Sequence, residues 1–239
     1  MDYSTKEIQQ IRAGRGKFLA MATAHCLGVF NDNYYKQVGL LLAAAAGLET
    51  LQGVAAFLFA LPYVLFSAHA GWLADHYPKR TVVIWAKALE LIAMVIGAVG
   101  IIYMNWYLIV GMIFIMGLQS TIFGPALNGS IPDLYPERYV PKANAILKLV
   151  VSLAVLIAVS TAGLSLDSTL LETKIPFGHL LVAVVVLVVA VIGVLASLRS
   201  IRTEPAGSKE KFPWMGPLIS ITTILHLRSD KKLLTALIS

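Results

Sequence analysis

The chain alternates between long apolar stretches and short polar connections. Six stretches rich in Leu, Ala, Val and Ile are long enough to cross the roughly 30 Å hydrocarbon core of a bilayer, which needs about 20 helical residues. They cover residues 18–46, 51–75, 81–104, 106–131, 142–164 and 178–199. They lack the period-two alternation of barrel strands, and only helices or closed barrels satisfy backbone hydrogen bonds in lipid. The pattern therefore predicts an all-α membrane protein with six transmembrane helices.

Composition supports this class. Hydrophobic residues make up 58% of the 239 and charged residues 13%, against about 25% charged in soluble domains. The pI near 9.4 does not indicate a nucleic-acid partner, because Lys and Arg collect in the cytoplasmic loops of membrane proteins. Since Cys26 is the one cysteine, the chain can form no internal disulfide and no site of several thiolates. We expect neither a metal nor a cofactor.

The basic residues predict the orientation of the chain. Four Lys and Arg precede the first stretch, two lie in the second connection, two lie in the fourth connection or at its border (Arg138 and Lys142), and seven lie from Arg199, at the end of the sixth stretch, onward. The opposite side carries only Lys174. Because cytoplasmic loops hold the excess of Lys and Arg, the N-terminus and the segment after the sixth stretch are predicted to be cytoplasmic.

We expect four parts along the chain. They are a cytoplasmic N-terminal segment (1–17), a six-helix bundle (18–199), a cytoplasmic loop (200–230) and the start of a seventh span (231–239). Within the loop, the apolar run at 218–228 is too short to span, which favours a helix at the membrane interface over a plain loop. Residues 231–239 begin with two lysines followed by apolar residues, which is typical of entry into a further span.

The connection between the second and third stretches carries the most specific motif, which reads Gly71-Trp-Leu-Ala-Asp75-His-Tyr-Pro-Lys79-Arg80. Gly71 allows a neighbouring helix to approach closely, and Asp75 can face a helix N-terminus or a basic side chain. Lys79 and Arg80 are predicted to anchor the turn at lipid headgroups. The motif resembles the loop of the major facilitator superfamily, with Pro78 where that family usually has glycine. The resemblance implies that Gly71, Asp75, Lys79 and Arg80 form a conformational latch between two halves.

A polar run interrupts the first stretch at Asn31, Asp32, Asn33 and Lys36. An Asp or Lys at the centre of a span costs about 2.5–3.5 kcal/mol on insertion scales, so these side chains should face the bundle interior or a water-filled cavity. Asp32 and Lys36 are four residues apart and share one helix face. Two interpretations remain open: a buried pair that holds spans together, or the lining of a substrate cavity.

Three other charges lie within the stretches. Lys87 and Glu90, three residues apart, can pair, but Lys87 lies near the cytoplasmic end and we favour an interpretation in which it snorkels to the headgroups. Lys148 has no acidic neighbour along its stretch. It must snorkel, find a distant partner or meet an anionic group of a substrate.

The fourth stretch ends with Gly124-Pro125-Ala126, where proline is predicted to kink or break the helix. Together with the Asn-Asp-Asn-x-x-Lys pattern that starts at Asn31 and the Lys-Ala-Asn that starts at Lys142, this segment resembles the lysophospholipid transporter family of the superfamily. The sequence departs from the pattern of this family at two places. After Gly-Pro-Ala it has Leu-Asn, with Asn128, where the family has Lys-Tyr, and in the fifth stretch it has Lys148 where the family has an acidic residue. The candidate substrate-binding residues are Asn31, Asp32, Asn33, Lys36, Asn128 and Lys148.

The resemblance implies a function. It implies the N-terminal half of a transporter that moves a lysophospholipid, such as lysophosphatidylethanolamine, across the bacterial inner membrane by alternating access. The partners implied are the substrate, membrane lipid and a C-terminal six-helix half absent from this chain. Some relatives are fused to a lysophospholipid acyltransferase and an acyl-carrier-protein ligase. That acyltransferase requires a histidine and an aspartate separated by four residues. None of the histidines of this chain has an aspartate five positions later, so the acyltransferase activity is expected outside this chain.

Two other functions fit the sequence. One is a proton-coupled transporter for a small polar or drug-like solute, with Asp32 as the titrating group. The other is a membrane anchor for a partner enzyme, which leaves the polar run without an evident reason. A Walker motif is absent from the sequence, so ATP is not the expected energy source.

Overall fold

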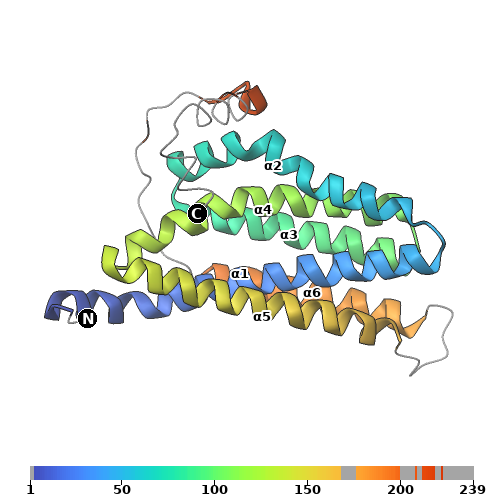
Figure 1. The fold of residues 1–239 in the computed structure, drawn as a ribbon, viewed down its shortest axis with the longest axis horizontal. Helices are drawn as coiled ribbons and strands as arrows, with labels where there is room; N and C mark the ends of the chain where they lie inside the picture. Colours follow the sequence, from blue (N-terminus) through green and yellow to red (C-terminus); the bar gives the residue numbers. More distant parts are fainter. Residues whose placement is uncertain (1–2, 168–175, 200–207, 209–211, 219–221, 223–239) are drawn as a thin grey trace, which may run out of the picture.

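The computed structural model describes residues 3–167, 176–199, 208, 212–218 and 222. In this part the long elements are all α-helices, with a short 3-10 turn η1 (Glu137–Tyr139), and they run side by side as one bundle (Figure 1). The helices are α1 (Thr5–Ala45), α2 (Thr50–His76), α3 (Lys79–Ile102), α4 (Trp106–Leu134), α5 (Val140–Leu166) and α6 (Phe177–Ser197). The prediction of an all-α membrane protein is confirmed.

Helices α2 to α6 are each long and apolar enough to cross a membrane. By that measure α1 does not qualify, although it lies within the same bundle (Figure 1). Its central turns carry the polar run from Asn31 to Lys36, which lowers its mean hydropathy. The first span is therefore the one whose polar groups most need partners from the protein.

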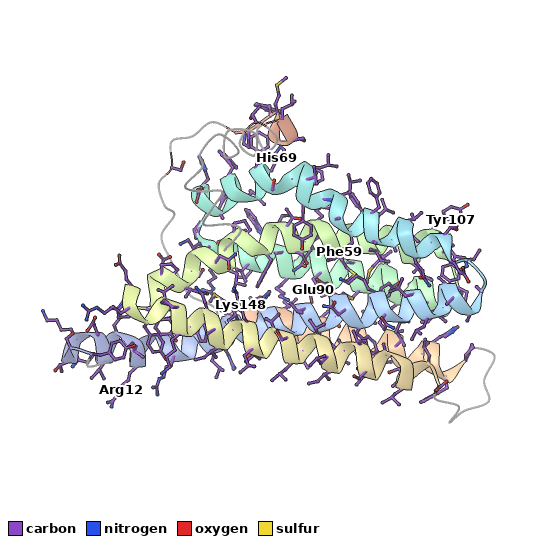
Figure 2. All side chains as sticks on the ribbon, viewed as in Figure 1. Arg12, Phe59, His69, Glu90, Tyr107 and Lys148 are labelled. Carbon is purple, nitrogen blue, oxygen red and sulfur yellow. The ribbon has the colours of Figure 1, made fainter. Side chains whose placement is uncertain are left out.

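Helix α1 starts earlier than the apolar pattern predicts. Ser4 caps it: the Glu7 backbone N–H donates to Ser4 Oγ at 3.3 Å, and the Ser4 backbone N–H donates to Glu7 Oε2 at 2.7 Å. Hydrogen bonding from Ser4 lowers the pKa of the Glu7 carboxyl below its usual range. The charged residues predicted as a separate N-terminal segment are thus helical and continuous with the span, and Arg12 lies where α1 projects beyond the bundle (Figure 2).

The helices pack in a pseudo-two-fold pattern that relates α1–α3 to α4–α6. Helix α2 packs mainly on α4, as α5 packs on α1; α3 packs on α4, as α6 packs on α1; and α3 packs on α6. The edges of the bundle in Figure 1 are accordingly α2 and α5. Such internal three-plus-three repeats are a property of many transporter folds, whose substrate sites lie near the interface between repeats. Here the two repeats are interlaced, because α1 and α4 each pack mainly on two helices of the other repeat, and the space between α1 and α4 is part of their interface.

Helix α4 passes through both of its prolines without interruption, so of the predicted kink or break at Gly124-Pro125 the break does not occur. Buried neighbours hold the helix, including Phe123 and Ala126 in one of the two apolar clusters of the bundle. Nearby, α4 approaches α2 closely: a Cβ added to Gly117 would lie 2.3 Å from the Phe59 carbonyl oxygen. A glycine at this crossing is therefore required by the backbone contact.

All ends that carry the basic residues lie together. The N-terminus, the α2–α3 and α4–α5 connections and the end of α6 share one end of the bundle (Figure 1). The connections that carry the basic residues therefore lie on one side, as the charge pattern predicts. The cytoplasmic location of that end stays a prediction. Most of the predicted interfacial helix at 218–228 and the whole of 231–239 lie outside the described residues.

Candidate functional site

A cavity of about 400 Å³ lies between α1, α2 and α4 and reaches a side chain of α3. Helices α1 and α4 are the central members of the two repeats, so the cavity lies at the interface that the fold predicts for a substrate. Its lining combines polar and aromatic side chains: His25, Asp32, Asn33, Lys36, Phe59, Tyr63, Lys87, Gln119, Ser120, Phe123 and Asn128, with Gly28, Val29, Gly124 and Leu127.

Four of the six candidate substrate-binding residues line this cavity, namely Asp32, Asn33, Lys36 and Asn128. Asp32 and Lys36 share one face of α1 because they are one helical turn apart, and Asn33 lies beside them. Asn128 comes from α4, on the opposite wall. Residues separated by almost a hundred positions in the sequence are thus brought together by the packing of α1 on α4.

Asn31 does not line the cavity. Successive helix residues point about 100° apart, and Asn31 faces α6, where its Nδ2 donates to the Val186 carbonyl oxygen at 3.1 Å. It is fully buried, and its Oδ1 has no partner among the described residues. Asn31 thus joins α1 to α6, and its assignment to a substrate is not supported by this cavity.

Lys148 is not among the residues that line the cavity either. Its side chain is exposed on α5 (Figure 2). Of the three interpretations of Lys148, the one that places it at an anionic group of a substrate receives no support from this cavity.

Asp32 and Lys36 line the cavity without bonding to each other. Asp32 is only 7% exposed, and its Oδ2 accepts a hydrogen bond from Ser120 Oγ at 2.8 Å. Its Oδ1 has no partner within the described ranges. Lys36 Nζ lies 3.9 Å from the centre of the Phe59 ring, a cation–π contact, and forms no ion pair with a described residue. Of the two interpretations left open for these charges, the structure agrees with the lining of a cavity and not with a buried pair.

Lys87 and Glu90 do pair, at 2.5 Å, and each side chain is 1% exposed. The prediction that Lys87 snorkels to the headgroups is therefore wrong, because the lysine turns inward to its acid. The pair fits because glycine faces it: a Cβ on Gly28 of α1 would lie 2.6 Å from Lys87 Nζ. The three-residue spacing of Lys87 and Glu90 indicated that the two side chains could pair. Nothing in the sequence showed that Gly28 of α1 would leave space for the pair inside the bundle.

A chain of polar side chains connects this pair to Asp32. Gln119 Nε2 donates to Glu90 Oε2 at 3.3 Å. The single hydroxyl proton of Ser120 can be donated to Gln119 Oε1 at 3.1 Å or to Asp32 Oδ2 at 2.8 Å. Sequence reasoning missed the part that Glu90, Gln119 and Ser120 play here, although a Gln-Ser pair in an apolar helix was a usable signal.

The result is a cavity wall that carries an acidic and a basic side chain not paired with each other. The Lys87–Glu90 pair is neutral overall, whereas Asp32 and Lys36 lie on the same wall, Asp32 with one oxygen that has no described partner. Such a wall suits a ligand that itself carries both charges. Within the described ranges, no group of three or more His, Cys, Asp or Glu side chains could hold a metal ion.

The loop motif binds protein groups at its basic end. Lys79 Nζ lies 2.6 Å from Asp133 Oδ2 and 2.6 Å from the Gly129 carbonyl oxygen, and Arg80 donates to the Leu198 carbonyl oxygen. These contacts join α3 to α4 and to the end of α6, which differs from the predicted anchoring at headgroups. Asp75 is exposed and makes no hydrogen bond or ion pair with a described residue.

At Gly71, a Cβ would meet no described atom within 4 Å. The predicted close approach of a neighbouring helix to Gly71 is therefore not made within this bundle. Gly71 and Asp75 both lie on open surface of α2.

Comparison with known proteins gives one family. Residues 18–239 match the model of the Major Facilitator Superfamily. The chain is also similar to curated proteins named lysophospholipid transporter LplT. It is 27% identical to that of Enterobacter sp. (strain 638) over 62% of this chain and 36% of the relative. For the Escherichia coli O1:K1 / APEC protein the identity is 27%, over 70% of this chain and 38% of the relative. For the Klebsiella pneumoniae protein the identity is 26%, over the same shares.

The alignments thus span well under half the length of these relatives. The family resemblance seen in the motifs is confirmed by both comparisons. So is the assignment to a multi-pass inner-membrane protein, given the apolar helices and the bacterial relatives.

Proposed function

Because this chain belongs to the major facilitator superfamily, we propose that it supplies one six-helix half of a transporter that moves lysophospholipid across the bacterial inner membrane by alternating access. The observation that supports it most is the cavity wall on which Asp32 and Lys36 lie one helical turn apart without pairing. The names of the relatives suggest the substrate class.

The headgroup of lysophosphatidylethanolamine matches this wall. Its phosphate requires a cation and its ammonium requires an anion. Lys36 is assigned to the phosphate, and Asp32, whose Oδ1 is free of described partners, to the ammonium. Asn33 and Asn128 are assigned to the remaining phosphate and glycerol oxygens. The Asn128 amide can donate two hydrogen bonds, and Asn33, whose Nδ2 donates to the Val29 carbonyl oxygen at 2.8 Å, keeps one amide proton for the ligand.

The opposite wall of the pathway is assigned to a second six-helix half. In this arrangement, the open surface at Gly71 and Asp75 is where that half docks, and Lys79 and Arg80 hold the α2–α3 turn against α4 and α6. These four residues then act as the conformational latch. An acyltransferase that consumes the transported lysophospholipid would be a separate catalytic partner.

The test is uptake of labelled lysophosphatidylethanolamine by proteoliposomes that contain the complete transporter. We expect uptake well above that of empty liposomes, and at least a tenfold loss in Asp32→Asn and in Lys36→Leu. Lys148→Leu serves as a matched lysine change outside the cavity and should stay within about twofold of wild type. Uptake no faster than in empty liposomes would falsify the proposal.

A second candidate function is proton-coupled transport of a small polar or drug-like solute. The burial of Asp32 with one oxygen free of described partners favours it, since such a carboxyl can take up a proton from the cavity. Under this proposal an imposed pH gradient drives uptake, and Asp32→Asn abolishes the response. A pH response that survives in Asp32→Asn eliminates the candidate.

A further inference from the structure

A second hollow of about 230 Å³ lies beside the polar cavity, between the same helices α1, α2 and α4. Its lining is almost entirely apolar and begins one turn beyond Lys36 on α1. Gly39, Leu40, Ala43, Leu51, Ala55, Ala56, Phe59, Trp106, Ile109, Val110 and Ile113 line it, together with Lys36 and Gln52. Residues 36 to 43 of α1 rise about 10 Å at 1.5 Å per residue, so the hollow is elongated along the bundle.

The two hollows meet at Lys36 and Phe59, which line both. The cation–π contact between these two side chains marks the border between a polar compartment and an apolar one. In Figure 2, Phe59 lies on α2 midway along the bundle and faces α4. A ligand with a charged head and a single apolar tail has the same division.

The apolar hollow continues to the end of the bundle. A third hollow shares Leu51, Trp106 and Val110 with it and reaches Tyr107, which is 91% exposed at the α3–α4 end (Figure 2). The three hollows share lining residues and lie in a row, which we call the tract, from the charged wall toward the surface near the α1–α2 turn. Charged side chains line the tract at one end only.

From this continuity we infer that the hollow lined by Gly39, Ala55, Ala56 and Ile113 is the site of the acyl chain of the ligand, with Lys36 and Phe59 at the junction of head and tail. The inference rests on the proposed function and adds to it a tail site. Lipid tails are about as apolar as leucine side chains, so moving a chain from bilayer to hollow has little hydrophobic driving force. Fit of the chain to the hollow, rather than burial, decides which ligand is held.

The site predicts selectivity for one chain over two. A tract bounded by α1, α2 and α4 accepts a single alkyl chain beside the Lys36–Phe59 junction, so a diacyl phospholipid would have to place its second chain outside this tract. The alternative occupant is a side chain or helix of the second half of the transporter, which would fill the hollow permanently.

Photo-crosslinking separates these occupants without relying on transport. The complete transporter in lipid nanodiscs is irradiated with a lysophosphatidylethanolamine that carries a diazirine at the tail end, and adducts are mapped by mass spectrometry. A diacyl phosphatidylethanolamine with the same diazirine is the matched control. We expect adducts of the lyso probe on the peptides with Ala56 and Ile113, displaced by unlabelled lysophospholipid. An adduct pattern identical to that of the diacyl control overturns the tail site.

Filling the hollow gives a second, independent test. In Ala56→Trp we expect uptake of a sixteen-carbon lysophospholipid to fall at least fivefold while uptake of an eight-carbon one is spared. Gly39→Leu should do the same, since a Cβ there makes only ordinary contact, 3.7 Å from Ile109 Cγ2. Val54→Trp is the control, because Val54 is 43% exposed on α2 and is not among the residues that line the hollow.

The outcomes also separate the two proposals. Equal losses for both chain lengths in Ala56→Trp and Gly39→Leu, with Val54→Trp active, contradict the tail site and leave lysophospholipid transport intact. Wild-type protein that moves neither chain length contradicts the proposed function, and the adduct map still decides whether the hollow binds a chain.

Discussion

Two acid–lysine doublets lie in neighbouring helices of this bundle and behave oppositely. Asp32 and Lys36, four apart in α1, line the cavity without an ion pair, whereas Lys87 and Glu90, three apart in α3, are closed into a pair with almost no exposure. Both spacings allow pairing on a helix. What differs is the surroundings: Lys87 and Glu90 are covered by Gly28 of α1 and Gln119 of α4, which leaves each side chain 1% exposed, while the face of α1 with Asp32 and Lys36 borders the cavity.

The contrast shows which charges are free to act. A buried lysine that pairs with its own helix has its charge compensated and contributes to holding the bundle. A carboxylate and an ammonium that hydrogen-bond elsewhere, to Ser120 and to the Phe59 ring, keep capacity for a ligand. The following four changes test this division.

The largest effect is expected from breaking the closed pair. Glu90→Ala leaves the Lys87 ammonium buried without its acid, which typically costs about 3–5 kcal/mol. Unfolding by denaturant in detergent micelles would measure the loss of stability. The double change Lys87→Met with Glu90→Leu removes both charges and should recover most of the loss. A double variant as unstable as Glu90→Ala contradicts the view that the uncompensated charge is what destabilises.

Crowding the closed pair should cost somewhat less. Gly28→Ala places a methyl group 2.6 Å from Lys87 Nζ and 3.0 Å from Glu90 Oε2, and overpacking of this kind costs about 1–3 kcal/mol. Gly71→Ala is the matched control, since its Cβ meets no described atom, and we expect it to stay within about 0.5 kcal/mol of wild type. Both are read from the same denaturant transitions. Equal stability of the two variants would mean that the Lys87 side chain moves aside at no cost.

Neutralising the open carboxylate should leave stability nearly unchanged. Asp32→Asn keeps an acceptor for Ser120 and removes a charge from a largely buried position, so we expect a change of under about 1 kcal/mol. Lysophospholipid uptake should nevertheless fall at least tenfold. A strongly destabilised Asp32→Asn protein would place Asp32 with the structural doublet instead.

The smallest change in stability is expected at Lys36. Lys36→Met retains most of the apolar stem and gives up one cation–π contact, worth about 0.5–1 kcal/mol at a partly exposed site. We expect weaker binding of lysophosphatidylethanolamine, measured by titration in nanodiscs, with little shift in the denaturant midpoint. Unchanged affinity would remove Lys36 from the ligand site.

Much of the fold followed from the sequence because hydrophobic length alone determines a membrane span. The loop motif from Gly71 to Arg80 identified the superfamily before any contact was known. The start of helix α1 was predicted less well. Its capping box at Ser4 lies in a polar segment, and hydrophobic length marks only the part of the helix that crosses the membrane. The unbroken course of α4 through Pro125 depends on neighbouring helices and cannot be read from the residues themselves.

The sequence predicted which segments contribute to the site, but it did not predict which side chains of those segments line the cavity. The polar run in α1 was correctly singled out, but of its three consecutive residues from Asn31 to Asn33 only the last two line the cavity, and Asn31 turns to α6. Lys87 was misjudged because the space beside it is created by a glycine of another helix. Pairing partners in a bundle are set by which helices pack together, and periodicity within one helix does not contain that information.

The exchange of helices between the two repeats also bears on how the protein is made. Helices α1, α2 and α3 have few contacts with one another, and the partners of Asn31, Asp32 and Glu90 outside α3 come from α4 and α6. During synthesis the first three spans are therefore made before the helices that carry the hydrogen-bond partners of their polar side chains. We therefore expect insertion of this half to be cooperative, with the polar side chains of α1 kept out of lipid until α6 has been made.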